Sequence, residues 1–408
     1  LWESDGTAAG TALLAQADPN TVSASSDPDE LFSSNGRRLL FNADDGVNGE
    51  TLWTWTIGSG ATMVTDINPS SNANPRDFFS VFVDDHEVTF FTANDGTHGI
   101  ELWSTDGTAA GTQLVADIRP GSGSSIPDDF FAFEGRLYFS ANDGTHGEEL
   151  WVSDGTAAGT HMVLDIRPGS SSSLPNTMAA FDGRFYFEAN DGTHGNELWV
   201  SDGTAAGTAL FLDARPGSSS GSPDWMREYA GQLIFTVNDG TLGEELWRTD
   251  GTVAGTTIAI DLRMGSGGSN PSNLGTYQGN LYFSATDGSS GNELYSLDPT
   301  LTALTFFGDL NNGSSSSTPN DLTVANGLLF FTATGTGAGQ ELWVTDGTLV
   351  GTLMLGDQNP GTAAFSPDFL TAVGGGVYFA ADTPTTGEEL WFSDGTVAGT
   401  TLACDLFP

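Results

Sequence analysis

The chain repeats one short motif, Glu-Leu-Trp or a close variant, at nearly constant intervals over its whole length. Successive copies of its aromatic residue are separated by 51, 50 and then six times by 48 residues, and these residues are Trp2, Trp53, Trp103, Trp151, Trp199, Trp247, Tyr295, Trp343 and Trp391. A fixed period of this length indicates a repeat architecture, in which each repeat folds as one supersecondary unit. The period therefore constrains the fold more than any other feature of the sequence.

One period contains four short segments that are typical of β-strands. Residues 129–134, 136–141, 148–153 and 160–166 are rich in aromatic and β-branched residues and are bounded by Gly, Asp, Asn or Pro. No segment shows the apolar period of an α-helix. Four antiparallel strands in about 48 residues match one blade of a β-propeller. A parallel β-helix is the alternative, but its coils are usually shorter and lack such hairpin turns.

The number of first strands gives the number of blades. First strands are predicted to begin near Asp27, Pro75, Pro127, Pro175, Pro223, Pro271, Pro319 and Pro367. We therefore predict an all-β fold, a single eight-bladed β-propeller over residues 27–408. Residues 1–26 are left as a surplus N-terminal hairpin and linker, in which residues 1–17 read as a third and a fourth strand. Because the chain starts inside a motif and without Met, we expect a processed product or an excerpt of a longer protein.

The charge of the chain excludes several classes of partner. The formal net charge is −42, and all 11 basic residues are Arg. Such a surface repels phosphate backbones and anionic lipids, so we expect no binding to nucleic acid or to membrane surfaces. No run of 18 apolar residues occurs, so we expect no membrane insertion. Divalent cations, cationic partners and a salty habitat are compatible with this charge. The single Cys404 excludes an internal disulfide framework.

The repeats resemble those of a known family. The segments "ELWSTDGT" (101–108), "ELWVSDGT" (149–156 and 197–204), "ELWRTDGT" (245–252), "ELWVTDGT" (341–348) and "ELWFSDGT" (389–396) are similar to the motif of the bacterial ELWxxDGT-repeat family. Two repeats depart from it, "TLWTWTIG" (51–58) and "ELYSLDPT" (293–300). The resemblance implies an extracellular, propeller-like protein, and it supplies no catalytic residues.

Two turns in each repeat carry carboxylates. In "SDGTAAGT", Asp154 can accept hydrogen bonds from the amides that follow it, which predicts a structural turn; its equivalents are Asp5, Asp106, Asp202, Asp250, Asp346 and Asp394. In the loop "NDGTHGEE", an Asp is followed six residues later by a Glu, in the pairs Asp95 and Glu101, Asp143 and Glu149, Asp191 and Glu197, and Asp239 and Glu245. Oxygen ligands at this spacing can hold Ca²⁺, the one cofactor that the sequence suggests. A turn followed by a strand cap is the alternative.

Two further sets of polar residues recur at fixed positions. His98, His146 and His194 occupy one loop position in three consecutive repeats, and shared ancestry explains them better than a metal site, because zinc needs ligands that converge. Short polar residues also begin the first strands, at the mouth of a propeller channel: Asp29, Asp128, Asn176, Asp224, Asn320 and Asp368, with Arg76 and Ser272 in the other two blades. This ring predicts either a site for a cation or polar ligand or caps of the turn after Pro.

No motif of a known catalytic type is present, and the repeats treat every blade alike. We therefore predict a non-enzymatic, extracellular structural or interaction propeller, secreted or at the cell surface. Its partners would be copies of itself or other surface components, and docking of the surplus hairpin on a neighbouring copy would build fibres. One alternative is a lectin-like propeller that binds glycans between its blades. The other is a secreted hydrolase with a site at the channel mouth.

Overall fold

The computed structural model describes residues 26–405, except residues 35, 37, 58, 84 and 85, together with the strand residues 2–3 and 12–13. Within this part of the chain the regular structure consists of β-strands and one 3₁₀ turn, η1 (Ala205–Gly207). None of the described segments forms a helix with the length and apolarity that a membrane crossing requires. The predicted hairpin of residues 1–17 lies mostly outside the described residues, which include only its strands β1 (Trp2–Glu3) and β2 (Ala12–Leu13).

The remaining strands form eight four-stranded antiparallel sheets, each with its strands in chain order, so the chain is an all-β propeller of eight blades, as predicted. The first four blades consist of β3 (Asp29–Ser34), β4 (Arg38–Asp44), β5 (Glu50–Thr56) and β6 (Gly60–Thr65); β7 (Arg76–Val83), β8 (His86–Asn94), β9 (Ile100–Thr105) and β10 (Gln113–Ala116); β11 (Asp128–Phe133), β12 (Arg136–Asn142), β13 (Glu148–Ser153) and β14 (His161–Leu164); and β15 (Asn176–Phe181), β16 (Arg184–Asn190), β17 (Asn196–Ser201) and β18 (Ala209–Leu212).

The other four blades consist of β19 (Asp224–Tyr229), β20 (Gln232–Asn238), β21 (Glu244–Thr249) and β22 (Thr257–Ile260); β23 (Ser272–Tyr277), β24 (Asn280–Thr286), β25 (Asn292–Leu297) and β26 (Leu304–Phe306); β27 (Asn320–Ala325), β28 (Leu328–Thr334), β29 (Gln340–Thr345) and β30 (Leu353–Met354); and β31 (Asp368–Val373), β32 (Gly376–Thr383), β33 (Gly387–Ser393) and β34 (Thr401–Cys404).

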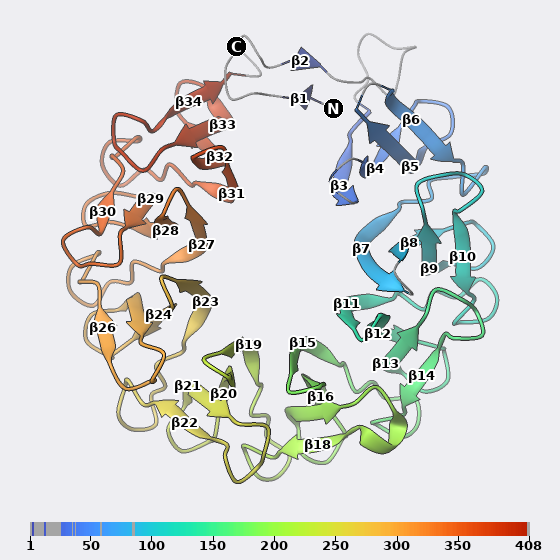
Figure 1. Cartoon of the computed structure of the whole chain (residues 1–408), viewed down its shortest axis with the longest axis horizontal. Helices are drawn as coiled ribbons and strands as arrows, with labels where there is room; N and C mark the ends of the chain where they lie inside the picture. Colours follow the sequence, from blue (N-terminus) through green and yellow to red (C-terminus); the bar gives the residue numbers. More distant parts are fainter. Residues whose placement is uncertain are drawn as a thin grey trace. The chain divides into compact units, whose positions relative to one another are not determined.

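The described blades divide into two compact units, one with blades 1–4 and one with blades 5–8, and the division falls between Ser220 and Gly221. Within each unit the first strands of successive blades contact one another. They form one edge of the unit, which we call the inner edge: β3, β7, β11 and β15 in one unit and β19, β23, β27 and β31 in the other (Figure 1).

Hairpin turns and alternating side chains build each blade. In blade 3, Glu134 and Gly135 have φ values of 47° and 73°, as a two-residue hairpin between twisted strands requires. Phe139 then pairs with Trp151 in the register of β12 and β13. The four predicted strands of this blade match the structure closely, except that β14 spans His161–Leu164 and so begins later and ends earlier than predicted.

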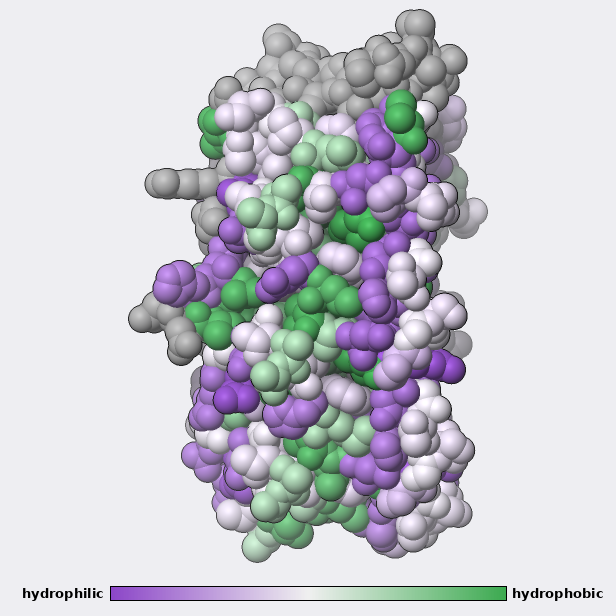
Figure 2. Space-filling model, turned by 90° about the vertical axis from the view of Figure 1, so that its right-hand side faces the viewer, coloured by the Kyte–Doolittle hydropathy of each residue, from purple (hydrophilic) through white to green (hydrophobic). Residues whose placement is uncertain are grey.

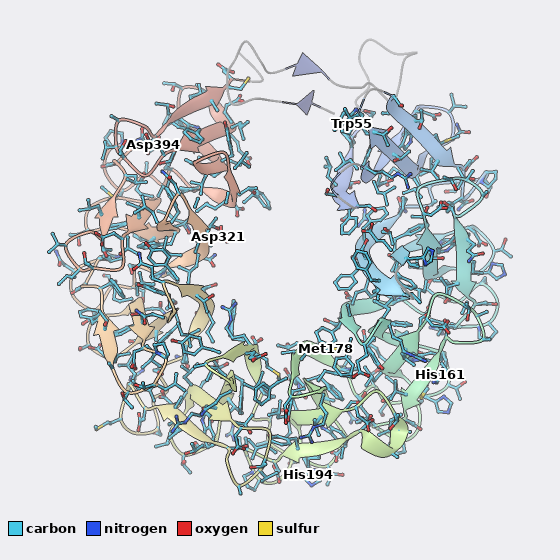
Figure 3. The ribbon with its side chains drawn as sticks, in the orientation of Figure 1. Trp55, His161, Met178, His194, Asp321 and Asp394 are labelled. Carbon is cyan, nitrogen blue, oxygen red and sulfur yellow. The ribbon has the colours of Figure 1, made fainter. Side chains whose placement is uncertain are left out.

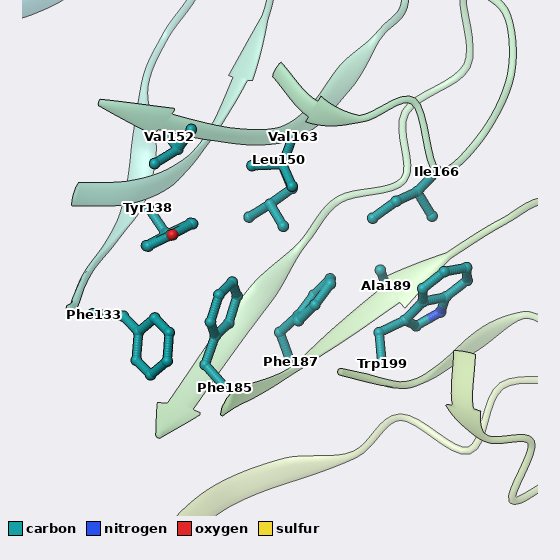
Figure 4. Close-up of a cluster of buried hydrophobic side chains, with 10 residues drawn as sticks. All are labelled: Phe133, Tyr138, Leu150, Val152, Val163, Ile166, Phe185, Phe187, Ala189 and Trp199. Atoms are coloured by element: carbon teal, nitrogen blue, oxygen red, sulfur yellow. The ribbon is translucent and has the colours of Figure 1, made fainter. Parts of the chain in front are cut away.

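The hydrophobic core lies between successive blades. Figure 4 shows one such layer, in which Tyr138, Leu150 and Val152 of blade 3 pack with Phe185 and Trp199 of blade 4. Trp151 lies on the opposite face of β13 and packs against blade 2. Both faces of this blade are therefore covered, and its third strand accordingly has no side that faces solvent.

The motif aromatics are core residues, as their alternation with Leu predicts. Five of the tryptophans, Trp53, Trp151, Trp199, Trp343 and Trp391, are 7–8% exposed, and Tyr295 is 2% exposed. Trp103 and Trp247 are half-buried. On the outer side of blades 1–4, by contrast, hydrophobic side chains lie in small areas flanked by hydrophilic ones (Figure 2).

The Asp-Gly-Thr turns are local structures, again as predicted. In blade 3 the Oδ1 atom of Asp154 accepts hydrogen bonds from the backbone N of Thr156 at 2.9 Å and from its Oγ1 at 2.7 Å. The same pair of bonds forms at Asp106, Asp202, Asp250, Asp346 and Asp394. Asp5 lies outside the described residues. These carboxylates therefore serve the turn in which they lie.

Candidate functional site

Every first strand begins with a β-bulge on the inner edge. In blade 3 the register shifts between Asp128 and Phe131, so two residues of β11 oppose one residue of β12. The residue at the bulge has a positive φ between 51° and 56° in all eight blades, and these residues are Glu30, Asp77, Asp129, Thr177, Trp225, Asn273, Asp321 and Phe369. Such a conformation costs free energy for a residue other than Gly. Because all eight blades adopt it, the bulge side chain takes the same position on each first strand.

The residues predicted to form a ring at the channel mouth immediately precede the bulges. The carboxylates of Asp128, Asp224 and Asp368 accept a hydrogen bond from the backbone N of the following residue, at 2.8, 2.6 and 2.8 Å. The amide oxygen of Asn176 accepts one from the Thr177 hydroxyl at 2.8 Å. Asp29 and Asn320 begin β3 and β27 in the same way. These residues begin the first strands on the inner edge, and where the bonds are seen they cap the bulge.

The bulge residue of blade 3, Asp129, has the most unusual environment on this edge. Burial among neighbouring protein atoms raises the pKa of Asp129 to about 6, and the negative charges of Asp128 and Glu148 add to the rise. The side chain nevertheless remains exposed to solvent. Asp129 is therefore a carboxyl group that a ligand can reach and that holds its proton to a higher pH than an ordinary Asp.

A buried hydroxyl faces this carboxyl group from the second strand. Ser140 on β12 is 0% exposed, and its Oγ atom has no hydrogen-bond partner of good geometry. It lies close enough to Asp129 to offset part of the rise in the pKa. In blade 2, Thr92 and Asp77 stand at the positions of Ser140 and Asp129. There the Thr92 hydroxyl donates a hydrogen bond to the Asp77 carboxylate at 2.9 Å.

The unit with blades 5–8 carries a second carboxyl pair on its inner edge. Burial raises the pKa of Asp321, the bulge residue of β27, and the charge and hydrogen bond of Asp368 on the next blade raise it further. Figure 3 shows Asp321 on the inner edge, whereas the turn residue Asp394 lies away from it. Asp321 is therefore a second carboxyl group on an inner edge that holds its proton to a higher pH than an ordinary Asp.

The Asp residues of the predicted calcium pairs stabilise their own loops. The Oδ1 atom of Asp143 accepts from the backbone N of Thr145 and of His146, both at 2.8 Å. Asp95, Asp191 and Asp239 make the corresponding bonds. Their Oδ1 atoms are thus occupied by amide donors.

The Glu residues of these pairs join one blade to the next. Glu101, Glu149, Glu197 and Glu245 are 0% exposed. The Oε2 atom of Glu149 accepts from the backbone N of Ile166 at 2.9 Å and from the Ser173 hydroxyl at 2.6 Å, and Ser173 lies in the connection to blade 4. Burial raises the pKa of Glu149, and these hydrogen bonds oppose the rise. Among the described residues no group of three or more His, Cys, Asp or Glu side chains is placed to hold a metal ion.

The histidines at one loop position each pair with an Asp of their own loop. The Nδ1 atoms of His98, His146 and His194 lie 2.7 Å from the Oδ2 atoms of Asp95, Asp143 and Asp191. The hydrogen bond to the Asp raises the pKa of each histidine. The row of histidines is therefore one local pair repeated in three blades.

The sequence did not single out Asp129 or Asp321 as site residues. Both follow a residue that was predicted to line the channel mouth, in the doublets Asp128-Asp129 and Asn320-Asp321. The missing information was the bulge, which moves the presented side chain one position along the strand. A polar doublet directly after the Pro of a first strand is the signal that would have indicated it.

The comparisons with known proteins found matches among solved structures only. No protein-family model and no curated protein matches the chain. Among the solved structures that match are a puromycin hydrolase (15% identity, TM-score 0.44, covering 96% of this chain and 60% of that one) and a prolyl endopeptidase (12%, 0.47, 92% and 49%). A puromycin-hydrolyzing peptidase of Mycobacterium tuberculosis also matches (11%, 0.44, 96% and 60%). The chain thus spans about half to three fifths of the length of these peptidases.

These matches contradict two predictions, that the chain is a non-enzymatic structural propeller and that it is not an enzyme. The matching proteins are hydrolases, so both predictions are corrected, together with the fibre that the first implied. At such low identity and TM-score the likeness says nothing of individual residues. The prediction failed because it took the blades as equivalent. The bulge residue is an acid in some blades and Thr, Trp, Asn or Phe in others, so the inner edge breaks the symmetry of the repeat.

Proposed function

We propose that the chain is a hydrolase that uses carboxyl groups of the inner edge for general acid–base catalysis, with Asp129 as the general acid. The observation that carries this proposal is the pKa of about 6 of an exposed Asp that lies beside two further carboxylates. Groups with a strongly perturbed pKa that a ligand can reach are typical of catalytic sites. The three carboxyl groups belong to Asp128, Asp129 and Glu148, all in blade 3.

The environments of the three carboxyl groups separate their roles. An Oδ1 atom of Asp128 is held by the backbone N of Asp129, so this residue positions the acid. Asp129 donates its proton to the leaving oxygen of the substrate as the bond to that oxygen breaks. A water molecule attacks the carbon, and its proton passes to Glu148 as general base. This division between a general acid and a general base is the one that hydrolysis of glycosidic bonds requires, so we propose a glycan as the substrate.

The test compares Asp129→Asn with Asp77→Asn. Both residues occupy the bulge with a positive φ, at 54° and 56°, a conformation that Asn adopts readily, so both variants should fold. With a panel of aryl glycosides and polysaccharides, Asp129→Asn should lower kcat/KM by about 100-fold or more, the usual contribution of a general acid. Asp77→Asn should leave it unchanged.

The pH profile gives an independent readout. Because Asp129 must hold its proton, activity of the natural chain should fall as the pH rises through about 6, and this limb should disappear in Asp129→Asn. Full activity of Asp129→Asn, or equal losses in the two variants, would overturn the assignment of the acid. An absence of hydrolysis over the whole panel would overturn the glycan substrate.

The pair of Asp321 and Asp368 is the alternative centre for the same chemistry, because burial and the neighbouring Asp368 raise the pKa of Asp321 and so favour it as a general acid. The variant Asp321→Asn distinguishes the two positions. If it loses activity while Asp129→Asn keeps it, the catalytic pair lies in blades 7 and 8.

A further inference from the structure

A pocket of about 510 Å³ lies beside the loop between the second and third strands of blade 8. Its walls come from the loop after β30, which contains Asn359, from residues 383–386 between β32 and β33, and from Trp391 and Leu402. Its volume falls in the range of about 300–1,000 Å³ that small-molecule sites occupy. We call it the blade 8 pocket.

Two buried polar atoms in the wall of this pocket have no hydrogen-bond partner. Asn359 is 4% exposed, and its Nδ2 atom donates to the carbonyl oxygens of Ala364 at 2.7 Å and Asp382 at 2.8 Å. These two bonds fix the orientation of the amide group and leave the Oδ1 atom without a donor. Trp391 is 8% exposed, and its Nε1 atom lacks an acceptor. Both atoms are covered in this structure, so a ligand in the pocket can bond to them only when the wall of the pocket moves.

The pocket forms where the sequence departs from the repeat. In blade 3 the corresponding space holds the long side chain of Arg119, which lies against the backbone of Gly144 in the Asp-Gly turn. In blade 8 the shorter Asn359 replaces the Arg, and Pro384 and Thr386 replace Gly144 and His146. The indole of blade 7 donates from Nε1 of Trp343 to the carbonyl oxygen of Ala333 at 3.0 Å, whereas Trp151 has an unpartnered Nε1 as Trp391 does. Blades 2 and 7 also carry Asn at the position of Asn359, so the loop with Pro384 and Thr386 is the feature that distinguishes blade 8.

The residues that line the blade 8 pocket indicate which class of ligand it can bind. None of the side chains that line the pocket is charged, although the whole chain carries a net charge of −42. Besides Asn359 and Trp391, the polar groups are Gln358 and the hydroxyls of residues 383, 385 and 386, and the apolar ones include Pro360 and Leu402. Neutral donors and acceptors with apolar walls suit an uncharged ligand that carries several hydroxyl groups.

We propose that the blade 8 pocket binds an uncharged sugar unit. When the wall moves to uncover the two atoms, one hydroxyl group of the sugar donates to the Oδ1 atom of Asn359, and another accepts from the Nε1 atom of Trp391. The site lies outside the blade that carries Asp129, and binding there does not depend on hydrolysis. A binding assay therefore tests it separately from the proposed function.

The experiment titrates the full chain with neutral monosaccharides and disaccharides and follows binding by calorimetry and by ligand-observed NMR. Trp391→Phe keeps an aromatic ring and removes Nε1–H, and loss of one neutral hydrogen bond should weaken binding by about five- to tenfold. Trp151→Phe is the matched control, because Trp151 also has an Nε1 atom without a partner but does not line the pocket. It should bind the sugar as the natural chain does.

A second variant tests the space itself. Ala363 is exposed and lines the pocket, so Ala363→Trp should fill it without removing a hydrogen bond and should abolish binding. Asp129→Asn should bind normally. The proposal is overturned if no neutral sugar binds at millimolar concentration, if Ala363→Trp binds as well as the natural chain, or if Trp151→Phe and Trp391→Phe weaken binding equally.

Discussion

Blades 3 and 8 use the same strands to carry two different loops. Phe139 pairs with Trp151 in blade 3, and Phe379 pairs with Trp391 in blade 8. In blade 3 the loop between the second and third strands is held by the carboxylate of Asp143, which accepts two backbone amides. In blade 8 the ladder continues for one further pair, Thr383 with Gly387, and a hydroxyl replaces the carboxylate.

The difference shows which parts of the repeat serve stability and which parts are free to change. Strand register and the buried indole are common to both blades, and each indole is 8% exposed. The loops contact solvent and the neighbouring connection, so a change there alters the shape of the surface and leaves the core unchanged. Blade 3 uses its regular loop to close the surface, and blade 8 opens a pocket at the same place.

The largest effect that we expect is on the core that the two blades share. Trp151→Ala should lower the free energy of unfolding by about 3–5 kcal/mol, the usual result of a large truncation in a packed core. Trp391→Ala should cost less, because the new space joins an existing pocket that water can enter. Thermal and urea unfolding of the two variants measure the difference. Equal losses in free energy of unfolding would show that the pocket does not reduce the cost of truncating Trp391.

The second effect concerns the buried glutamates. Burial raises the pKa of Glu101 and Glu341 to about 7, and it also raises the pKa of Glu149, Glu245 and Glu293. The folded chain therefore binds protons more tightly than the unfolded chain, in which an ordinary Glu titrates at about 4.3. Stability should fall as the pH rises from that value through about 7.

Blade 1 provides the comparison for this prediction, because Thr51 stands where the other blades have the Glu, and its hydroxyl donates to the carbonyl oxygen of Thr65 at 2.9 Å. Melting temperatures at pH 5 and pH 8, at equal ionic strength, measure the pH dependence. Glu341→Gln should weaken the pH dependence, because it removes one group whose pKa is raised in the folded chain. The variant should fold, because the Oε1 atom of Glu341 has no hydrogen-bond partner to lose. A variant with the full dependence would show that Glu341 titrates normally in the folded chain.

The sequence predicted the parts of this structure that repeat and missed those that do not. The spacing of the tryptophans and the hairpin glycines predicted blades, strands and burial, because all of these follow from periodicity. It could not predict the bulge that presents Asp129, since a bulge depends on the register between two strands. Nor could it predict the blade 8 pocket. That space depends on how the connection with Asn359 packs beside the loop with Pro384, two segments that are separate in the sequence.

A smaller effect separates the two loops themselves. Asp143→Ala removes the acceptor of two backbone amides and should lower the free energy of unfolding by about 1–2 kcal/mol, as loss of a helix cap does. Thr383→Ala in blade 8 should cost less, because the neutral Oγ1 atom of Thr383 accepts from one backbone amide, that of Thr386 at 3.3 Å, where Asp143 accepts from two at 2.8 Å. Unfolding curves of both variants give the comparison. A larger loss in Thr383→Ala would show that the blade 8 loop is the more tightly held one.

The smallest effect that we expect comes from calcium. The Oδ1 atom of Asp143 already accepts two amides, and the Oε2 atom of Glu149 accepts an amide and a hydroxyl, so binding of Ca²⁺ would have to displace these donors. Added Ca²⁺ should still raise the melting temperature somewhat, because a net charge of −42 is screened by any cation. Sodium chloride of equal ionic strength is the control for screening. If Ca²⁺ stabilises the chain well beyond that control, and Asp143→Ala loses this increment whereas Thr383→Ala keeps it, the loops of the regular blades are calcium sites after all.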